Sequence, residues 1–381
     1  MAVRLERLLE AVEDQEICLL AGASGLRTPI RWVHMVEGTE ISTFLEGGEL
    51  AFVTGIALCP ECTLEQLVRD IQAHGAGGVL INVGPYIPEV PQPVIDFCDS
   101  KDFPLLTVPW HIRMAVIMKR FSEAILLSDR VQTEWAAALE NAILHPMEEQ
   151  LYQSALESRG LRLEWSYCAA LLEPASQESL PSCLRAVENF LTVHCPEVSF
   201  AELNGQVMLL FANCPAEQVQ ALVQAVLDAC ANALPGIVLY AGIGRATRSA
   251  RCIAASYHLA QKVLLLQKRR DAAGQSACYQ ELGAYRLLMA VEDQELLREY
   301  TAALLGPLRT FDSANNTDYV GFLRTWIACD CSSQRTAEQM FLHRNTVDYH
   351  LRRIAGLLDA DLSQLDTRFQ LSLALKALEL C

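Results

Sequence analysis

The sequence lacks an excess of positive charge. Its 381 residues hold 30 Lys and Arg against 46 Asp and Glu, which gives a formal net charge of −16 at pH 7. A protein that coats nucleic acid without regard to sequence needs a broad basic surface, so that class is excluded. Any contact with DNA has to come from a local patch of positive charge.

Long apolar runs are missing as well. No stretch reaches the roughly 18 consecutive apolar residues that a membrane-spanning helix needs. Residues 1–16 carry acidic side chains early and have a helical period, unlike the basic start and apolar centre of a signal peptide. We therefore expect a cytoplasmic protein without a membrane partner.

Paired metal-binding motifs are scarce. The 14 cysteines are scattered; Cys59 and Cys62 form one Cys-x-x-Cys, and Cys329 and Cys331 form one Cys-x-Cys. Structural zinc sites usually need two such pairs, or one pair and a matching His pair. We expect no metal and no cofactor, and the simpler interpretation of Cys59–Cys62 is a turn that contains two thiols.

The N-terminal third alternates between short apolar segments and helical periods. Residues 1–16 predict a first helix. Further strands are predicted over 50–55, 79–84 and 104–109, and further helices over 63–74 and 93–100. Thr63 followed by Gln66 has the pattern of a capping box. Short, continuously apolar strands between helices predict a parallel sheet covered on both faces.

Polar side chains and glycines stand where these strands end. They are Thr54, Gly55, Asn82 and Gly84, with Glu37 in the segment before the first of these strands. In open parallel sheets, ligands bind outside the carboxyl ends of the strands, and glycine lets a ligand approach the backbone. These five residues are our candidate site for a small polar effector; loop residues without a ligand are the alternative.

A helical connector is predicted from about residue 113 to 144. Its apolar seam recurs at alternating steps of three and four: Ile117, Phe121, Ala124, Ser128, Val131, Trp135, Ala138 and Ala142. Two interpretations are open, a connector that forms a dimer and a helix that packs on its own chain.

The middle of the chain has the order strand-helix-strand-strand-helix-strand over 167–243, with Asn204-Gly205 as a hairpin turn. This order predicts a ferredoxin-like sheet with helices on one face. A nucleotide cyclase of this architecture needs two carboxylates in that hairpin to hold metal, and here the turn is Leu203-Asn204-Gly205-Gln206. We therefore expect no enzymatic activity from this domain.

The C-terminal segment predicts a helix-turn-helix. One helix is expected over 319–329, and a second, starting at Ser332 or Ser333, carries Ala337, Met340 and Phe341. A third follows over 343–354 with Asn345 as its cap. Small Ala337 allows the last two helices to approach, and Val347 fills the space between them.

The outer face of the third helix carries groups that read DNA. The candidate contacts are Arg344, Asn345, Thr346, Tyr349, His350, Arg352 and Arg353. Arg pairs with guanine and Asn with adenine in the major groove, while hydroxyls and His reach base edges or phosphates. From Arg335 to Ile354, four Arg face only Glu338 and Asp348, a local excess of positive charge. An ordinary solvated helix face is the alternative.

These motifs also carry a family resemblance. TAEQMFLHRNTVDYHLRRI at 336–354 and RFQLSLALKAL at 368–378 resemble the C-terminal helix-turn-helix of PucR/CdaR-type bacterial transcriptional regulators, with His350 where that family most often has Arg. Segments 19–37, 44–55 and 76–84 are similar to the PucR N-terminal domain. Segments 203–211 and 241–264 resemble the degenerate GGDEF-like domain of these regulators.

The resemblance implies an N-terminal domain that senses a metabolite linked to purine, nitrogen or carbon catabolism. It also implies a C-terminal domain that binds DNA as a homodimer or higher oligomer and activates nearby catabolic genes, with RNA polymerase as a further candidate partner. Two other classes stay open: a small-metabolite enzyme in the N-terminal α/β domain, and a protein-interaction module that uses the C-terminal helices.

We predict a multidomain α/β and α+β protein. The predicted parts are a parallel-sheet α/β sensor at 1–112, a helical connector at 113–160, a ferredoxin-like, degenerate GGDEF-like domain at 161–285, and a helical region at 286–381 whose all-α helix-turn-helix core spans 318–381.

Overall fold

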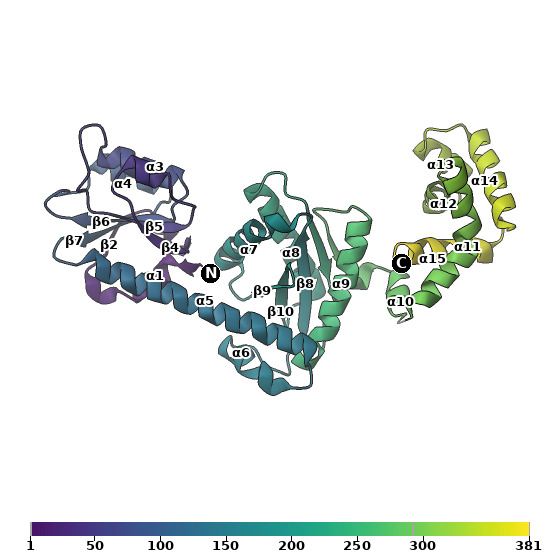
Figure 1. The fold of residues 1–381 in the computed structure, drawn as a ribbon, viewed down its shortest axis with the longest axis horizontal. Coiled ribbons are helices and arrows are strands. Elements are labelled where there is room, and N and C mark those ends of the chain that lie inside the picture. The colour runs from purple at the N-terminus through teal and green to yellow at the C-terminus, as the bar shows by residue number, and fades with distance from the viewer. Residues whose placement is uncertain (1, 292, 381) are drawn as a thin grey trace. The chain divides into compact units, whose positions relative to one another are not determined.

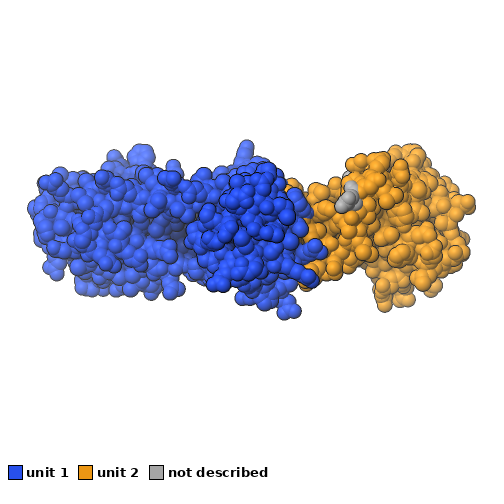
Figure 2. Space-filling view, turned by 90° about the horizontal axis from the view of Figure 1, so that it is seen from below, with its two compact units in different colours: residues 1–241, 245–258, 273–276 blue, residues 242–244, 259–272, 277–381 orange. Residues whose placement is uncertain are grey.

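The computed structural model describes residues 2–291 and 293–380. They form two compact units, coloured separately in Figure 2. Unit 1 runs from the N-terminus to Ala241 and adds Arg245–His258 and Ala273–Ser276. Unit 2 consists of Gly242–Gly244, Leu259–Ala272 and the chain from Ala277 onward.

Unit 1 begins with a five-stranded sheet of order β2-β7-β6-β5-β4. Four strands run parallel: β4 (Trp32–Met35), β5 (Glu49–Val53), β6 (Gly78–Val83) and β7 (Leu105–Pro109). The edge strand β2 (Cys18–Ala21) pairs with β7 in the antiparallel direction. The predicted parallel sheet is thus confirmed in its centre. Strands β2 and β4 were not predicted, because both are short and carry exposed residues instead of a continuous apolar run.

Helices cover both faces of this sheet (Figure 1). On one face lie α3 (Leu64–Ala73) and α4 (Gln92–Ser100), and on the other α1 (Leu5–Glu10) and the first part of α5 (Met114–Leu144). The capping box of Thr63 and Gln66 is confirmed. The first helix is shorter than predicted, because Val3–Arg4 forms strand β1, which pairs with β3 (Pro29–Ile30). The short α2 (Thr39–Ser42) lies between β4 and β5.

The connector is the 31-residue helix α5. Ile117 and Phe121 of its seam are buried in the core under the sheet, and Trp135, Ala138 and Ala142 are buried further along the helix. The interpretation that the seam packs on its own chain is therefore confirmed for these residues. Other apolar side chains of α5 remain exposed: Val116, Leu126, Leu127 and Val131.

After α6 (Gln153–Ser158) comes a second five-stranded sheet of order β12-β11-β8-β10-β9. Its strands are β8 (Tyr167–Pro174), β9 (Ser199–Leu203), β10 (Gln206–Ala212), β11 (Leu239–Ile243) and β12 (Ser276–Cys278). The helices between and after them are α7 (Leu180–His194), α8 (Ala216–Ala233) and α9 (Ile253–Arg269). The order of β11, β8, β10 and β9 is that of a ferredoxin-like sheet, as predicted, and β12 adds an edge. Positive φ angles at Asn204 (52°) and Gly205 (77°) confirm the hairpin turn.

The C-terminal part of unit 2 is helical. It contains α10 (Tyr285–Met289), α11 (Gln294–Asn315), α12 (Tyr319–Ala328), α13 (Ser333–Gln339), α14 (Arg344–Leu358) and α15 (Leu365–Leu378). Leu305, Leu323, Val347, Ile354 and Leu371 meet in one buried core, so these helices fold around a common centre. Across the described residues, no helix is both long and apolar enough to cross a bilayer.

Candidate nucleic-acid interface

Side-chain caps fix where the helices of the predicted helix-turn-helix begin. The carboxylate of Asp318 accepts a hydrogen bond from the Gly321 amide (2.8 Å) at the start of α12. The hydroxyl of Ser332 accepts one from the Arg335 amide (3.4 Å) at the start of α13. Ser332, one of the two predicted caps, is therefore the one used.

The turn between α13 and α14 contains an unusual residue. The amide of Leu342 donates to the carbonyl of Ala337 (2.9 Å), which closes the end of α13. Phe341 has a φ of 55°, in the left-handed region that favours glycine, and its side chain is 96% exposed. The prediction that α13 carries Phe341 is wrong, because the helix ends at Gln339 and the chain reverses through this left-handed residue.

Small and aliphatic residues join α13 to α14. Ala337 and Val347 are both buried in the same core, as predicted. Thr336 is fully buried, and its hydroxyl donates to the Ser332 carbonyl (2.8 Å), so this buried polar group is satisfied. The opposite side of α14 faces solvent.

That open side carries the predicted contact residues with one exception. Arg344, Asn345, Tyr349, Arg352 and Arg353 are exposed, and Thr346 is half-buried. The nearest contact between the side chains of Arg344 and Asp348 is 4.0 Å at an exposed site, so this ion pair holds the guanidinium only weakly. Each of these groups is placed to meet a ligand that approaches α14 from outside.

Two of these arginines also make contacts within the protein. The Nε of Arg352 donates to the backbone carbonyl of Asp348 (3.2 Å). The guanidinium of Arg353 lies over the ring of Phe311, 5.3 Å from its centroid. Arg344 is therefore the best test residue, because its removal disturbs the fewest contacts within the chain.

His350 is the exception. Its ring lies 5.1 Å from the ring of Phe322 and 5.5 Å from that of Tyr319, both on α12. Its Nδ1 atom is shielded from solvent and has no hydrogen-bond partner among the described residues. The prediction that His350 stands on the outer face is wrong, because its ring packs against the aromatic side chains of α12.

The cap of α14 also differs from the prediction. The ring nitrogen Nδ1 of His343 accepts a hydrogen bond from the Asn345 amide (3.2 Å), so His343 and not Asn345 is the cap. The helix consequently begins at Arg344, and the side chain of Asn345 stays exposed in its first turn.

The candidate effector residues lie at or near the carboxyl ends of the strands of the N-terminal sheet. Their polar groups form hydrogen bonds within the protein. The carboxylate of Glu37 accepts hydrogen bonds from the amide (3.0 Å) and hydroxyl (2.6 Å) of Thr54 and from the amide of Gly55 (3.1 Å). These contacts tie the end of β5 to the segment after β4. A role in effector binding stays a prediction.

Asn82 and Gly84 are used in the same way. The side-chain amide of Asn82 donates to the carbonyls of Val108 (3.3 Å) and Pro109 (3.2 Å) at the end of β7. A Cβ atom on Gly84 would lie only 2.5 Å from the Cβ of Trp110, so glycine is needed there for packing.

The segment with the two closely spaced thiols is a turn. The backbones of Cys59 and Cys62 exchange hydrogen bonds of 3.2 and 3.0 Å. Within the parts of the chain that the structure describes, no group of three or more His, Cys, Asp or Glu residues is arranged to hold a metal ion.

Comparison with known proteins identifies three domains in the chain. It matches the Purine catabolism regulatory protein-like family over residues 8–125, the GGDEF-like domain over 117–266 and the PucR C-terminal helix-turn-helix domain over 319–377. Two of these three models, at the two ends of the matched range, describe parts of PucR-type proteins, so the chain is similar to proteins of that type.

Two curated relatives illustrate this likeness. The proline-responsive transcriptional activator PutR of Bacillus subtilis is 34% identical over 26% of this chain and 24% of the relative. The purine catabolism regulatory protein of the same organism is 30% identical over 28% of this chain and 20% of the relative. The matches thus span a quarter or less of either relative.

One solved structure, the regulator of polyketide synthase expression from Bifidobacterium adolescentis, is 19% identical to this chain. The match covers 65% of this chain and 97% of that one, with a TM-score of 0.27, which is too low to bear on the fold.

Proposed function

We propose that this chain is a sequence-specific DNA-binding transcriptional regulator that responds to a small-molecule effector. The observation that carries this proposal is the exposed face of α14, held against α13 through buried Ala337 and Val347. The names of the two curated relatives, an activator and a regulatory protein, support it. Its targets would be catabolic genes for purine, nitrogen or carbon metabolism, and its place of action the cytoplasm, where the DNA is.

The proposed contacts follow from the geometry of recognition helices, whose first turns meet base edges in the major groove. Arg344 pairs with guanine and Asn345 with adenine, because both are exposed in the first turn of α14. Tyr349 and Arg352, further along the helix, reach phosphates. Arg335 takes no part, because its guanidinium is already paired with Asp330 (2.6 Å).

The domain roles complete the proposal. The sensor (1–112) and the connector (113–160) set the spacing of two recognition helices in a homodimer. The GGDEF-like domain (161–285) follows them in the chain and acts without catalysis, and the helices of 286–381 bind DNA. The exposed apolar residues Leu126 and Leu127 of α5 are the proposed contact between the two copies. RNA polymerase is the proposed partner in activation.

The first test is titration of the full chain onto labelled DNA from upstream of its own gene and its neighbours, at two salt concentrations. We expect saturable binding that is tighter than on scrambled DNA and weaker at high salt, because phosphate contacts release counterions. Arg344→Ala should weaken binding about ten-fold or more through loss of a base contact.

Arg298→Ala is the matched control. Arg298 is an exposed arginine on α11 in the same unit, paired with Glu295 (3.1 Å), and its loss should leave DNA affinity unchanged. Equal affinity of the wild type and Arg344→Ala would overturn the assignment of α14 as the recognition helix.

A second candidate function rests on exposed apolar side chains in unit 2. Phe341, Leu365 and Phe369 are 96%, 82% and 62% exposed. Apolar groups of this size favour a protein partner for the C-terminal helices. Binding of DNA fragments that does not depend on their sequence, together with a salt-insensitive protein partner, would favour this function over DNA recognition.

A further inference from the structure

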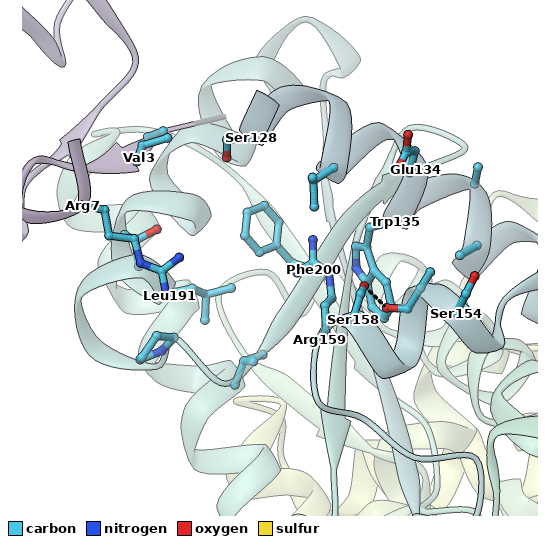
Figure 3. A pocket seen from close by; sticks show the side chains of 18 of the residues that line it. Val3, Arg7, Ser128, Glu134, Trp135, Ser154, Ser158, Arg159, Leu191 and Phe200 are labelled. Carbon is cyan, nitrogen blue, oxygen red and sulfur yellow. Dashed lines mark hydrogen bonds between the residues drawn. The ribbon is translucent and has the colours of Figure 1, made fainter. Parts of the chain in front are cut away.

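A cleft of about 920 Å³ opens in unit 1 beside the middle of α5. Its walls come from four places in the chain: the segment 2–7, α5, α6 with the residues that follow it, and the segment 191–200. This volume lies in the range of small-molecule sites. Figure 3 shows Arg159, Trp135 and Phe200 gathered in the cleft, with Arg7 reaching in from α1.

Arg159 is the decisive residue of this cleft. Its guanidinium lies over the indole of Trp135, 4.5 Å from the ring centroid, and donates to the side-chain carbonyl oxygen of Gln132 (2.8 Å). Both partners are neutral, and no ion pair joins Arg159 to a carboxylate among the described residues. Burial lowers the pKa of Arg159 below its ordinary value, which shows that the charge is poorly solvated.

A half-buried guanidinium stays protonated, and an anion that reaches it would replace part of the solvation that burial removes. The other charges of the cleft also favour an anion. Arg4 and Arg7 line the side formed by the N-terminal segment, and the guanidinium of Arg4 is paired with Glu6 (3.2 Å). The acid in the lining, Glu134, is paired with Arg130 (3.0 Å). Among the described residues, Arg7 and Arg159 are therefore the lining arginines without an ion pair, in a chain of net charge −16.

The rest of the wall suits an organic anion with an apolar body. Trp135 is 1% exposed, and its indole N–H has no acceptor among the described residues. Its ring and that of Phe200 are buried behind the wall, whereas Val131 and Leu151, 45% and 42% exposed, present apolar surface to the cleft. Ser154, Ser158 and Thr192 supply hydroxyl groups.

We propose that this cleft binds a small organic carboxylate with an apolar body, whose carboxylate pairs with Arg159 while the body packs against the exposed apolar side chains of Val131 and Leu151. Its role as the effector site rests on the proposed function; the binding itself does not. A ligand here would join α6 to the middle of α5, the helix whose first part packs under the sensor sheet. It would therefore act on the connector directly, away from the strand ends at Glu37 and Thr54.

Calorimetric titration of the full chain with benzoate, its uncharged isostere benzamide and inorganic phosphate tests the proposal. We expect benzoate to bind at one site per chain, and benzamide and phosphate at least ten-fold more weakly. Absence of benzoate binding, equal binding of benzamide, or tighter binding of phosphate would overturn the proposal.

Two variants and a control locate the site. Arg159→Gln should weaken benzoate binding at least ten-fold, and Arg162→Gln should not, because Arg162 is exposed and lies near Trp165, outside the cleft lining. If Arg159→Gln does not fold, Ser158→Trp at the exposed edge should block binding by filling the cleft. Unchanged affinity in the folded Arg159→Gln, or in Ser158→Trp, contradicts the assignment.

The same ligand, added to the DNA titration, separates this inference from the proposed function. A change in DNA affinity with benzoate in the wild type but not in Ser158→Trp supports the effector role. If benzoate binds but DNA does not, the ligand site is supported and the proposed function is contradicted. If DNA binds but benzoate does not, the proposed function is supported and the ligand site is contradicted.

Discussion

Phe341 adopts a conformation that side chains rarely adopt. Its φ of 55° places a bulky residue in the left-handed region, yet its exposed ring gains no packing in return. Replacing it by glycine relieves about 1 kcal/mol of backbone strain, partly offset by the greater freedom of glycine in the unfolded chain. We therefore expect Phe341→Gly to raise the urea midpoint of unfolding.

Phe341→Ala is the control for this prediction, because alanine keeps the strain and removes the same ring. Its midpoint should stay near that of the wild type. If glycine and alanine shift the midpoint equally, backbone strain is not the cause. An exposed ring held in a strained backbone conformation next to α14 is also what a protein-binding site would show. This supports testing whether the C-terminal helices bind a protein partner.

Residue patterns predicted packing better than they predicted turns. Ala337 and Val347 could be placed in one core from their size and spacing, because helical period fixes which residues face inward. The turn at Phe341 and the helix cap at His343 could not be predicted. Glycine is favoured at a left-handed turn position, and Ser, Thr, Asp or Asn is favoured as a helix cap. His350 was misplaced because its ring packs on Tyr319 and Phe322, which are distant in sequence.

At the scale of elements, Tyr285 of α10 forms a side-chain contact with the C-terminal end of α15. Its hydroxyl donates to Glu379 (2.7 Å), and the Arg270 guanidinium lies 4.4 Å from its ring centroid. Burial, followed by the hydrogen bond to Glu379, raises the pKa of Tyr285 to about 12. In the unfolded chain a tyrosine loses its proton near pH 10.

The sign of the pH dependence follows from these two values. The folded state keeps the proton to higher pH, so the contribution of Tyr285 to stability is complete below about pH 10 and is lost as the pH rises toward 12. Tyr285→Phe lacks this contribution. The unfolding free energy of the wild type, relative to this variant, should therefore fall between pH 9 and about 11.5 in urea titrations; a constant difference would contradict the prediction.

Elements with strong local signals were predicted, and those held by distant partners were not. α3 has a capping box and a clear apolar face, and its bounds agree with the sequence to within a residue. β2 has neither, because its pairing with β7 comes from residues far along the chain. The Arg159 cleft was missed for the same reason, since its walls join segments that no motif connects.

At the scale of the whole molecule, α5 presents two sides with different expected roles. Leu127 is 63% exposed, whereas Trp135 is buried. We expect Leu127→Glu to lower dimerisation in sedimentation experiments with little change in melting temperature. Trp135→Glu should instead lower the unfolding free energy by roughly 3 kcal/mol or more, because it buries a charge. A fully dimeric Leu127→Glu that folds normally would exclude this surface as the contact.

The length of α5 has a mechanical consequence. At about 1.5 Å per residue, its 31 residues form a rod about 46 Å long. A tilt of about 5° around its first turns would carry the far end through roughly 4 Å, more than the length of a hydrogen bond. A ligand bound in the proposed cleft near the middle of α5 would therefore need to change the angle of the helix only slightly to displace its far end by that distance.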